Sequence, residues 1–104
     1  MSSKYQQQVT DLIKEHEIVV FSKSWCPYCK AAKATLDQEH VEHTDLELDK
    51  LDVGDAIQDA IYQLTSQRTV PAIWIHGKFV GGNSDLQTLK RNGKLKTMLN
   101  ESSL

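Results

Sequence analysis

The chain has 104 residues, a formal net charge of −2, 39% hydrophobic residues and 25% charged residues. This length predicts a single domain over residues 1–104, and the composition is typical of a globular protein rather than a disordered one. The small negative charge argues against a nucleic-acid-binding surface. No apolar run is long enough to cross a membrane, and residues 1–8 lack the apolar stretch of a secretory signal. We therefore expect a cytoplasmic protein with no nucleic-acid or membrane partner.

The N-terminal segment carries a helix pattern followed by a strand pattern. Apolar residues recur at helical spacing between positions 5 and 13, after Ser2 or Ser3 as a possible N-cap. The unbroken apolar run at 18–21 predicts a strand that is buried on both faces of its sheet.

A second helix is predicted to begin at Pro27, because proline suits the first turn of a helix, where its missing N–H costs no hydrogen bond. The buried face of this helix is expected to carry Cys29, Ala32 and Leu36. Residues 44–48 alternate weakly between apolar and polar side chains, which indicates a second strand, parallel to the first.

The C-terminal half carries a helix, a hairpin and a helical tail. After Gly54, a helix is predicted because Ile57, Ala60, Ile61 and Leu64 follow the spacing i, i+3, i+4, i+7. Strands at 72–75 and 78–80 flank a short turn that contains glycine, as in a β-hairpin. A further helix is predicted to begin near Ser84 and to end around Gly93, followed by a short helical stretch.

The predicted order of elements is therefore α-β-α-β-α-β-β-α. A strand–helix–strand unit implies a right-handed parallel crossover, whereas the later pair of strands forms an antiparallel hairpin. Together they predict an α/β domain in which a four-stranded mixed sheet has helices on both faces.

The chain has two cysteines, Cys26 and Cys29, separated by two residues. A zinc site built on such a pair needs two further ligands at suitable spacing. His40 and His43 are the two histidines that lie close together, and no spacing pairs them with the cysteines. We expect both histidines to be solvated surface residues, and we predict no metal site.

The position of Cys26, between a predicted strand and a predicted helix, favours chemistry at its sulfur. Unpaired N–H groups and the positive end of the helix dipole would stabilise a thiolate there, and Lys23 adds positive charge with no competing acid expected nearby. Because a low-pKa thiolate is also a weaker nucleophile, the larger benefit is that Cys26 becomes a good leaving group. Cys29, one turn into the helix, is expected to be buried within disulfide reach. The alternative is that both cysteines pack as small apolar residues.

Three segments together resemble the dithiol glutaredoxins. Residues 23–29 (Lys-Ser-Trp-Cys-Pro-Tyr-Cys) are similar to the active-site segment of that family. Residues 67–71 (Gln-Arg-Thr-Val-Pro) resemble its T-V-P loop, and residues 81–85 (Gly-Gly-Asn-Ser-Asp) its G-G-x-[SD]-D segment. The similarity covers nearly the whole chain and leans toward cytosolic fungal and other eukaryotic members. It implies a thioredoxin-like fold, glutathione as co-substrate and no metal.

The resemblance also implies a glutathione site around Cys26. Its residues would be Lys23, Cys26, Tyr28, Gln67, Arg68, Thr69, Val70, Pro71, Gly82, Ser84 and Asp85. The family pattern places a cis peptide bond before Pro71 and sets the Val70 backbone against the cysteine of glutathione, like a short added strand. The segment 82–85 would hold the γ-glutamyl end, and Lys23 with residues 67–68 would take the glycyl carboxylate. Taken alone, these segments predict only a loop, a turn and a helix cap.

By the same resemblance, two reaction cycles are implied. The Cys26 thiolate would attack the glutathionyl sulfur of a protein–glutathione mixed disulfide, and a second glutathione would release Cys26. With a protein disulfide as substrate, Cys29 would resolve the mixed disulfide. The expected partners are glutathione and proteins that are glutathionylated or carry disulfides, with the chain acting as a monomer.

Two other functions remain open at this point. One is a thioredoxin-like protein disulfide reductase, although Pro27 follows the first cysteine rather than preceding the second. The other is a dimer that holds a [2Fe–2S] cluster through Cys26 and two glutathiones, which Pro27 is thought to disfavour. Trp25 departs from the tyrosine that many dithiol members carry, and we expect this to change packing or activity rather than function.

Overall fold

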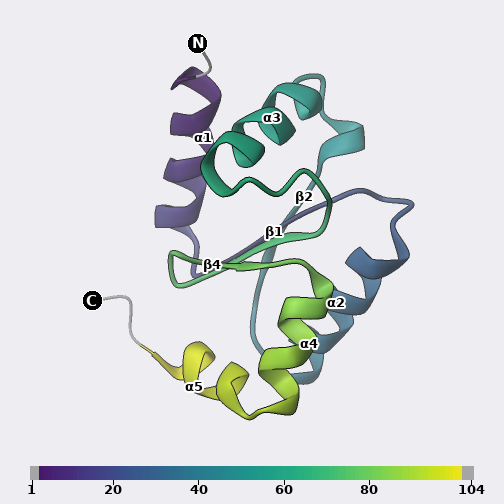
Figure 1. The fold of residues 1–104 in the computed structure, drawn as a ribbon, viewed down its shortest axis with the longest axis vertical. Coiled ribbons are helices and arrows are strands. Elements are labelled where there is room, and N and C mark those ends of the chain that lie inside the picture. Colours follow the sequence, from purple (N-terminus) through teal and green to yellow (C-terminus); the bar gives the residue numbers. More distant parts are fainter. Residues whose placement is uncertain (1–2, 102–104) are drawn as a thin grey trace.

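The computed structural model describes residues 3–101. Its elements, shown in Figure 1, are α1 (Ser3–Glu15), β1 (Ile18–Ser22), α2 (Pro27–Gln38), β2 (Thr44–Glu47), the 3-10 helix η1 (Leu48–Lys50), α3 (Gly54–Thr65), β3 (Ala72–Ile75), β4 (Lys78–Gly81), α4 (Asn83–Arg91) and α5 (Lys94–Asn100). The predicted α/β order is confirmed, including the short final helix. Of the two predicted caps of the first helix, Ser3 lies inside α1 and Ser2 lies outside the described residues.

The four strands form one mixed sheet in the order β2-β1-β3-β4. Strands β1 and β2 are parallel, β1 and β3 are antiparallel, and β3 and β4 form the predicted hairpin. His76 and Gly77 in its turn both have positive φ, at 49° and 80°, as a two-residue hairpin turn of this hand requires. Strand β2 ends at Glu47, one residue before its predicted end, because Leu48 begins η1 and turns inward.

Helices cover both faces of the sheet, with α1 and α3 on one side and α2, α4 and α5 on the other (Figure 1). Successive residues of β1 point to opposite faces, so Val19 and Phe21 pack toward α1 and α3 while Ile18 and Val20 pack toward α2 and α4. All residues of β1 are buried, which confirms the prediction of a two-sided strand. Each of its four apolar side chains, Ile18 to Phe21, contributes about 1.5–3 kcal/mol on burial, which makes β1 a major part of the core.

Of the four apolar positions that predict α3, the first three are buried, whereas Leu64, in the last turn, is 46% exposed beside an open groove lined also by Trp74 and Phe79. One prediction about burial is wrong. His43 was expected to be solvated, yet its side chain is only 10% exposed and lies between the carboxylates of Asp37 and Asp45, at 2.8 and 2.7 Å. These carboxylates converge because the chain turns back from α2 into β2. His40, by contrast, is exposed as predicted.

The topology brings three distant segments to one edge of the sheet. The end of β1 lies opposite the start of β3, with Phe21 paired to Ala72, and the start of β3 lies opposite the end of β4, with Ile73 paired to Gly81. The cysteine loop after β1, the loop before β3 and the glycine pair at the end of β4 therefore meet. Across residues 3–101, no helix combines the length and the apolar character needed to cross a membrane.

Candidate active site

Cys26 is the N-cap residue of α2. Its backbone is extended, Pro27 occupies the first turn, and its Sγ accepts a hydrogen bond from the N–H of Cys29 at 3.2 Å. The N–H of Cys26 in turn donates to the carbonyl of Lys23 at 3.1 Å, which closes a tight turn before the helix. A thiolate at this position gains a charge-assisted hydrogen bond, worth about 1.5–3 kcal/mol, and the positive end of the helix dipole. The predicted position of Cys26 is confirmed.

Cys29 has a different environment although it belongs to the same motif. Its side chain is fully buried, and both cysteines are free thiols. Burial, followed by the hydrogen bond and the charge of Cys26, raises the pKa of Cys29 to about 12, while the Lys23 backbone and the charge of Lys33 oppose this shift. Cys29 therefore keeps its proton at neutral pH. The two sulfurs are suited to different steps of thiol–disulfide exchange, which proceeds through the thiolate.

The loop before β3 lies directly beside Cys26. The Val70–Pro71 peptide bond is cis, and the Val70 carbonyl oxygen is 3.9 Å from the Cys26 Sγ. The Gln67 side-chain amide donates to the carbonyls of Thr69 and Pro71, each at 3.0 Å. Because a primary amide has two N–H donors, both are engaged with the loop here. Gln67 thus stabilises the conformation of residues 69–71, the segment that would face a ligand.

Arg68 lies on the outer side of this loop. Its guanidinium is 3.2 Å from an Asp59 carboxylate oxygen and lies over the Tyr62 ring, 4.1 Å from the ring centroid. The Arg68 carbonyl accepts a hydrogen bond from the Gln58 amide at 2.7 Å. Gln58 thus ties the loop to α3, a contact that no sequence motif indicated.

A groove of about 450 Å³ joins the loop before β3, the start of α4 and the start of α2. Its lining residues are Tyr28, Thr69, Val70, Pro71, Gly82, Asn83 and Ser84. At one end the Gly82 N–H donates to an Asp85 carboxylate oxygen at 2.9 Å, which fixes that carboxylate at the start of α4. The groove thus brings together predicted site residues from all three segments, and its volume suits a small-molecule ligand.

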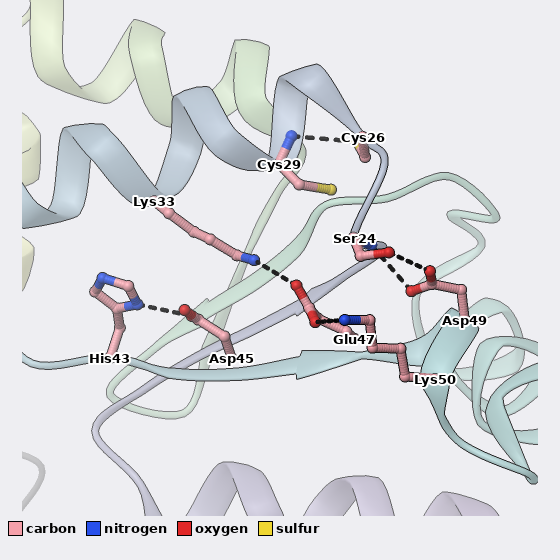
Figure 2. A network of polar contacts seen from close by, with 9 residues as sticks. All are labelled: Ser24, Cys26, Cys29, Lys33, His43, Asp45, Glu47, Asp49 and Lys50. Carbon is pink, nitrogen blue, oxygen red and sulfur yellow. Dashed lines mark hydrogen bonds and ion pairs between the residues drawn. The ribbon is translucent and has the colours of Figure 1, made fainter.

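Asp49, a residue of η1, binds the cysteine loop through hydrogen bonds from Ser24 (Figure 2). The Ser24 N–H donates to one Asp49 carboxylate oxygen at 2.9 Å, and the Ser24 hydroxyl donates to the other at 2.5 Å. These hydrogen bonds lower the pKa of Asp49, so it stays ionised. The expectation that no acid lies near this loop is therefore wrong, because η1 folds back against it. The Lys23 side chain makes a different contact, with its ammonium 5.7 Å from the centroid of the Trp25 ring. Trp25 itself is 66% exposed.

Comparison with known proteins agrees with this geometry. Residues 18–80 match the family described as Glutaredoxin. The chain belongs to the glutaredoxin family. Glutaredoxin-1 of Rhizophagus irregularis is 48% identical to it over 97 residues, which cover 93% of this chain and 96% of the relative. Glutaredoxin-1 of Saccharomyces cerevisiae is 44% identical over 103 residues, covering 95% and 94% respectively.

A solved structure extends the likeness to three dimensions. A buckwheat glutaredoxin–glutathione complex superimposes with a TM-score of 0.92 at 41% identity, covering 94% of this chain and 89% of that chain. The thioredoxin-like fold is therefore confirmed. Members of this family are glutathione-dependent thiol–disulfide oxidoreductases, and this glutaredoxin is an enzyme of that class.

Proposed function

We propose that this glutaredoxin reduces protein–glutathione mixed disulfides through Cys26 alone. The observation that carries the proposal is the position of the Cys26 sulfur, which accepts the Cys29 N–H at the start of α2. The Cys26 thiolate attacks the glutathionyl sulfur, a Cys26–glutathione bond forms, and the protein thiol leaves with the electron pair and takes up a proton. A second glutathione then attacks that disulfide and leaves as oxidised glutathione, which returns Cys26 to the thiolate.

Protein disulfides follow a second cycle that uses both cysteines. Cys26 first forms a mixed disulfide with the substrate, and Cys29 then attacks the Cys26 sulfur and releases the substrate. Glutathione reduces the resulting Cys26–Cys29 bond. Cys26 is 4% exposed and Cys29 0%, which supports this order, since the less buried residue meets the substrate first.

Glutathione is proposed to lie in the groove beside Cys26. The Val70 backbone would pair with the cysteine residue of glutathione. Tyr28, Thr69 and Pro71 would line the groove around it. The N–H groups at the start of α4, with Gly82, Ser84 and Asp85, would hold the γ-glutamyl end. Lys23, Gln67 and Arg68 would meet the glycyl carboxylate in exchange for their present contacts with Trp25, the loop carbonyls and Asp59. The glutathione complex of the similar buckwheat protein supports this choice of ligand.

Residues 1–104 are proposed to form one domain that acts as a monomer on glutathionylated and disulfide-containing proteins. We place it in the cytoplasm, because both cysteines are needed as free thiols and a reducing compartment keeps them so.

The test is the glutathione-dependent reduction of a small mixed disulfide, coupled to glutathione reductase and NADPH. Wild type and Cys29→Ser should be active, and Cys26→Ser should be inactive while its circular dichroism spectrum is unchanged. Reduction of a protein disulfide should be lost in both variants. Activity of Cys26→Ser on the mixed disulfide, or an inactive wild type, would overturn the proposal.

A further inference from the structure

Lys33 lies one helical turn after Cys29 on α2 and outside every motif that the sequence displays. Residues four apart share one face of a helix, so Lys33 extends along the side of α2 that carries Cys29. Its side chain is 20% exposed, and its ammonium is 3.7 Å from a carboxylate oxygen of Glu47, the last residue of β2. Figure 2 shows the side chains of Cys29 and Lys33 extending from α2 toward the sheet, with Lys33 directed at Glu47.

The resolving step of the dithiol cycle requires ionisation of a thiol that the fold buries. Burial, the hydrogen bond with Cys26 and the Cys26 charge all raise the pKa of Cys29, to about 12. Once Cys26 is joined to a substrate it carries no charge, so the repulsion between the two sulfurs disappears. What remains in favour of the Cys29 thiolate is the Lys23 backbone and the positive charge of Lys33.

We propose that Lys33 is a positioning residue for the dithiol cycle: its ammonium stabilises the Cys29 thiolate as that thiolate attacks the mixed disulfide at Cys26. This inference rests on the dithiol cycle proposed above. It assigns Lys33 no part in the monothiol cycle, in which Cys29 does not react.

The chemical step is an intramolecular exchange. Cys29 releases its proton to solvent, and its thiolate attacks the Cys26 sulfur. The Cys26–Cys29 bond forms while the bond between Cys26 and the substrate sulfur breaks. The electron pair leaves with the substrate thiolate, which takes up a proton, so that the substrate is reduced and the two cysteines are oxidised.

A two-phase reaction isolates this step. The reduced protein is mixed with one equivalent of the disulfide dithiobis(nitrobenzoate), whose thiolate product, nitrothiobenzoate, is coloured. The first release of nitrothiobenzoate reports attack by Cys26, and the second reports resolution by Cys29. In Cys29→Ser the second phase must be absent.

In Lys33→Gln the second phase should be about three- to ten-fold slower at neutral pH, with the first phase unchanged. One unit of pKa reduces the thiolate tenfold, and the higher nucleophilicity of the more basic thiolate recovers part of that loss. The deficit should shrink as pH rises, since Cys29 then ionises without help. Lys33→Arg should restore the rate, and Lys30→Gln, which removes an exposed charge from the same helix, should leave it unchanged.

Glu47→Gln separates an electrostatic role from a structural one. If the ion pair merely fastens α2 to β2, Glu47→Gln must slow the second phase as much as Lys33→Gln does, which would overturn the proposal. If Lys33 acts through its charge, removal of the neighbouring carboxylate leaves a larger net positive field, and the second phase should be as fast as wild type or faster. An unchanged second phase in Lys33→Gln over the whole pH range also overturns it.

Failure of the proposed function gives a different pattern. A wild type that completes both phases but does not reduce a glutathione mixed disulfide contradicts the glutathione cycle and leaves the role of Lys33 standing. A Lys33→Gln variant that retains mixed-disulfide reduction and loses only the second phase supports both.

Discussion

Replacing Gly81 by alanine tests whether the Asp85 carboxylate must occupy its present position. Gly81 has a φ of +118°, and a Cβ at this position would lie 2.2 Å from an Asp85 carboxylate oxygen. The backbone of β4 cannot move away easily, because Gly81 pairs with Ile73 in the sheet. The Asp85 side chain can rotate instead, at the expense of its hydrogen bond to the Gly82 N–H. The substitution therefore displaces a group assigned to substrate binding.

The expected cost has two parts. Alanine at this φ is strained by about 1–3 kcal/mol, and the exposed hydrogen bond from Gly82 to Asp85 contributes about 1 kcal/mol more. The free energy of unfolding should thus fall by about 2–4 kcal/mol. Loss of the Asp85 contact with the ammonium of the γ-glutamyl group should lower kcat/KM for a glutathione mixed disulfide by about 5- to 30-fold, equivalent to about 1–2 kcal/mol.

Gly93→Ala is the matched control for this experiment. Gly93 also has positive φ, at +80°, but an added Cβ there meets nothing within 4 Å. It should lose about 1–2 kcal/mol of stability from backbone strain alone and keep full activity. Urea unfolding and the glutathione reductase-coupled assay give both quantities. If Gly81→Ala matches Gly93→Ala in kcat/KM, then the carboxylate position does not matter and our reasoning about Asp85 is wrong.

Two further predictions concern stability. Gly54→Ala places a Cβ 1.9 Å from the Leu48 carbonyl oxygen, a backbone atom, so urea unfolding should show a loss of about 3 kcal/mol; a loss below about 1 kcal/mol would contradict this packing. Burial lowers the pKa of His43, but hydrogen bonds to Asp37 and Asp45 outweigh it and raise the pKa above 6.5. Its stabilising contribution is therefore complete below 6.5 and lost as pH rises through the folded pKa. His43→Gln should be less stable than wild type at acidic pH while the carboxylates are ionised, and the difference, followed by thermal unfolding, should close at alkaline pH; a gap that is constant with pH would argue against the imidazolium.

Local sequence signals predicted most of the fold because each was reinforced by its neighbours. The apolar run of β1, proline at the start of α2 and glycine in the hairpin turn each restrict the backbone within a few residues. The position of Cys26 followed from two of these signals, a strand before it and Pro27 after it. Where the relevant contact was local, the sequence was sufficient.

Contacts between distant segments were not predictable in this way. Asp49 reaches Ser24 across 25 positions of sequence, because η1 folds back behind the cysteine loop. Gln58 binds the Arg68 carbonyl only because the loop before β3 passes along α3. The sequence predicts a surface position for His43, since no periodicity reports that the carboxylates of Asp37 and Asp45 converge on its side chain. Such contacts depend on tertiary geometry, which spacing along the chain does not encode.

The same distinction separates the two cysteines. Cys26 owes its properties to the start of α2, which Pro27 and the preceding strand specify locally. Cys29 is fully buried, so in our proposal the ionisation that it needs depends on a cation supplied by the fold, the ammonium of Lys33. A chain with the same cysteine motif but a neutral residue at position 33 should therefore retain the reaction of Cys26 and carry out the resolving reaction of Cys29 more slowly. The motif specifies the first thiol reaction, whereas tertiary contacts set the rate of the second.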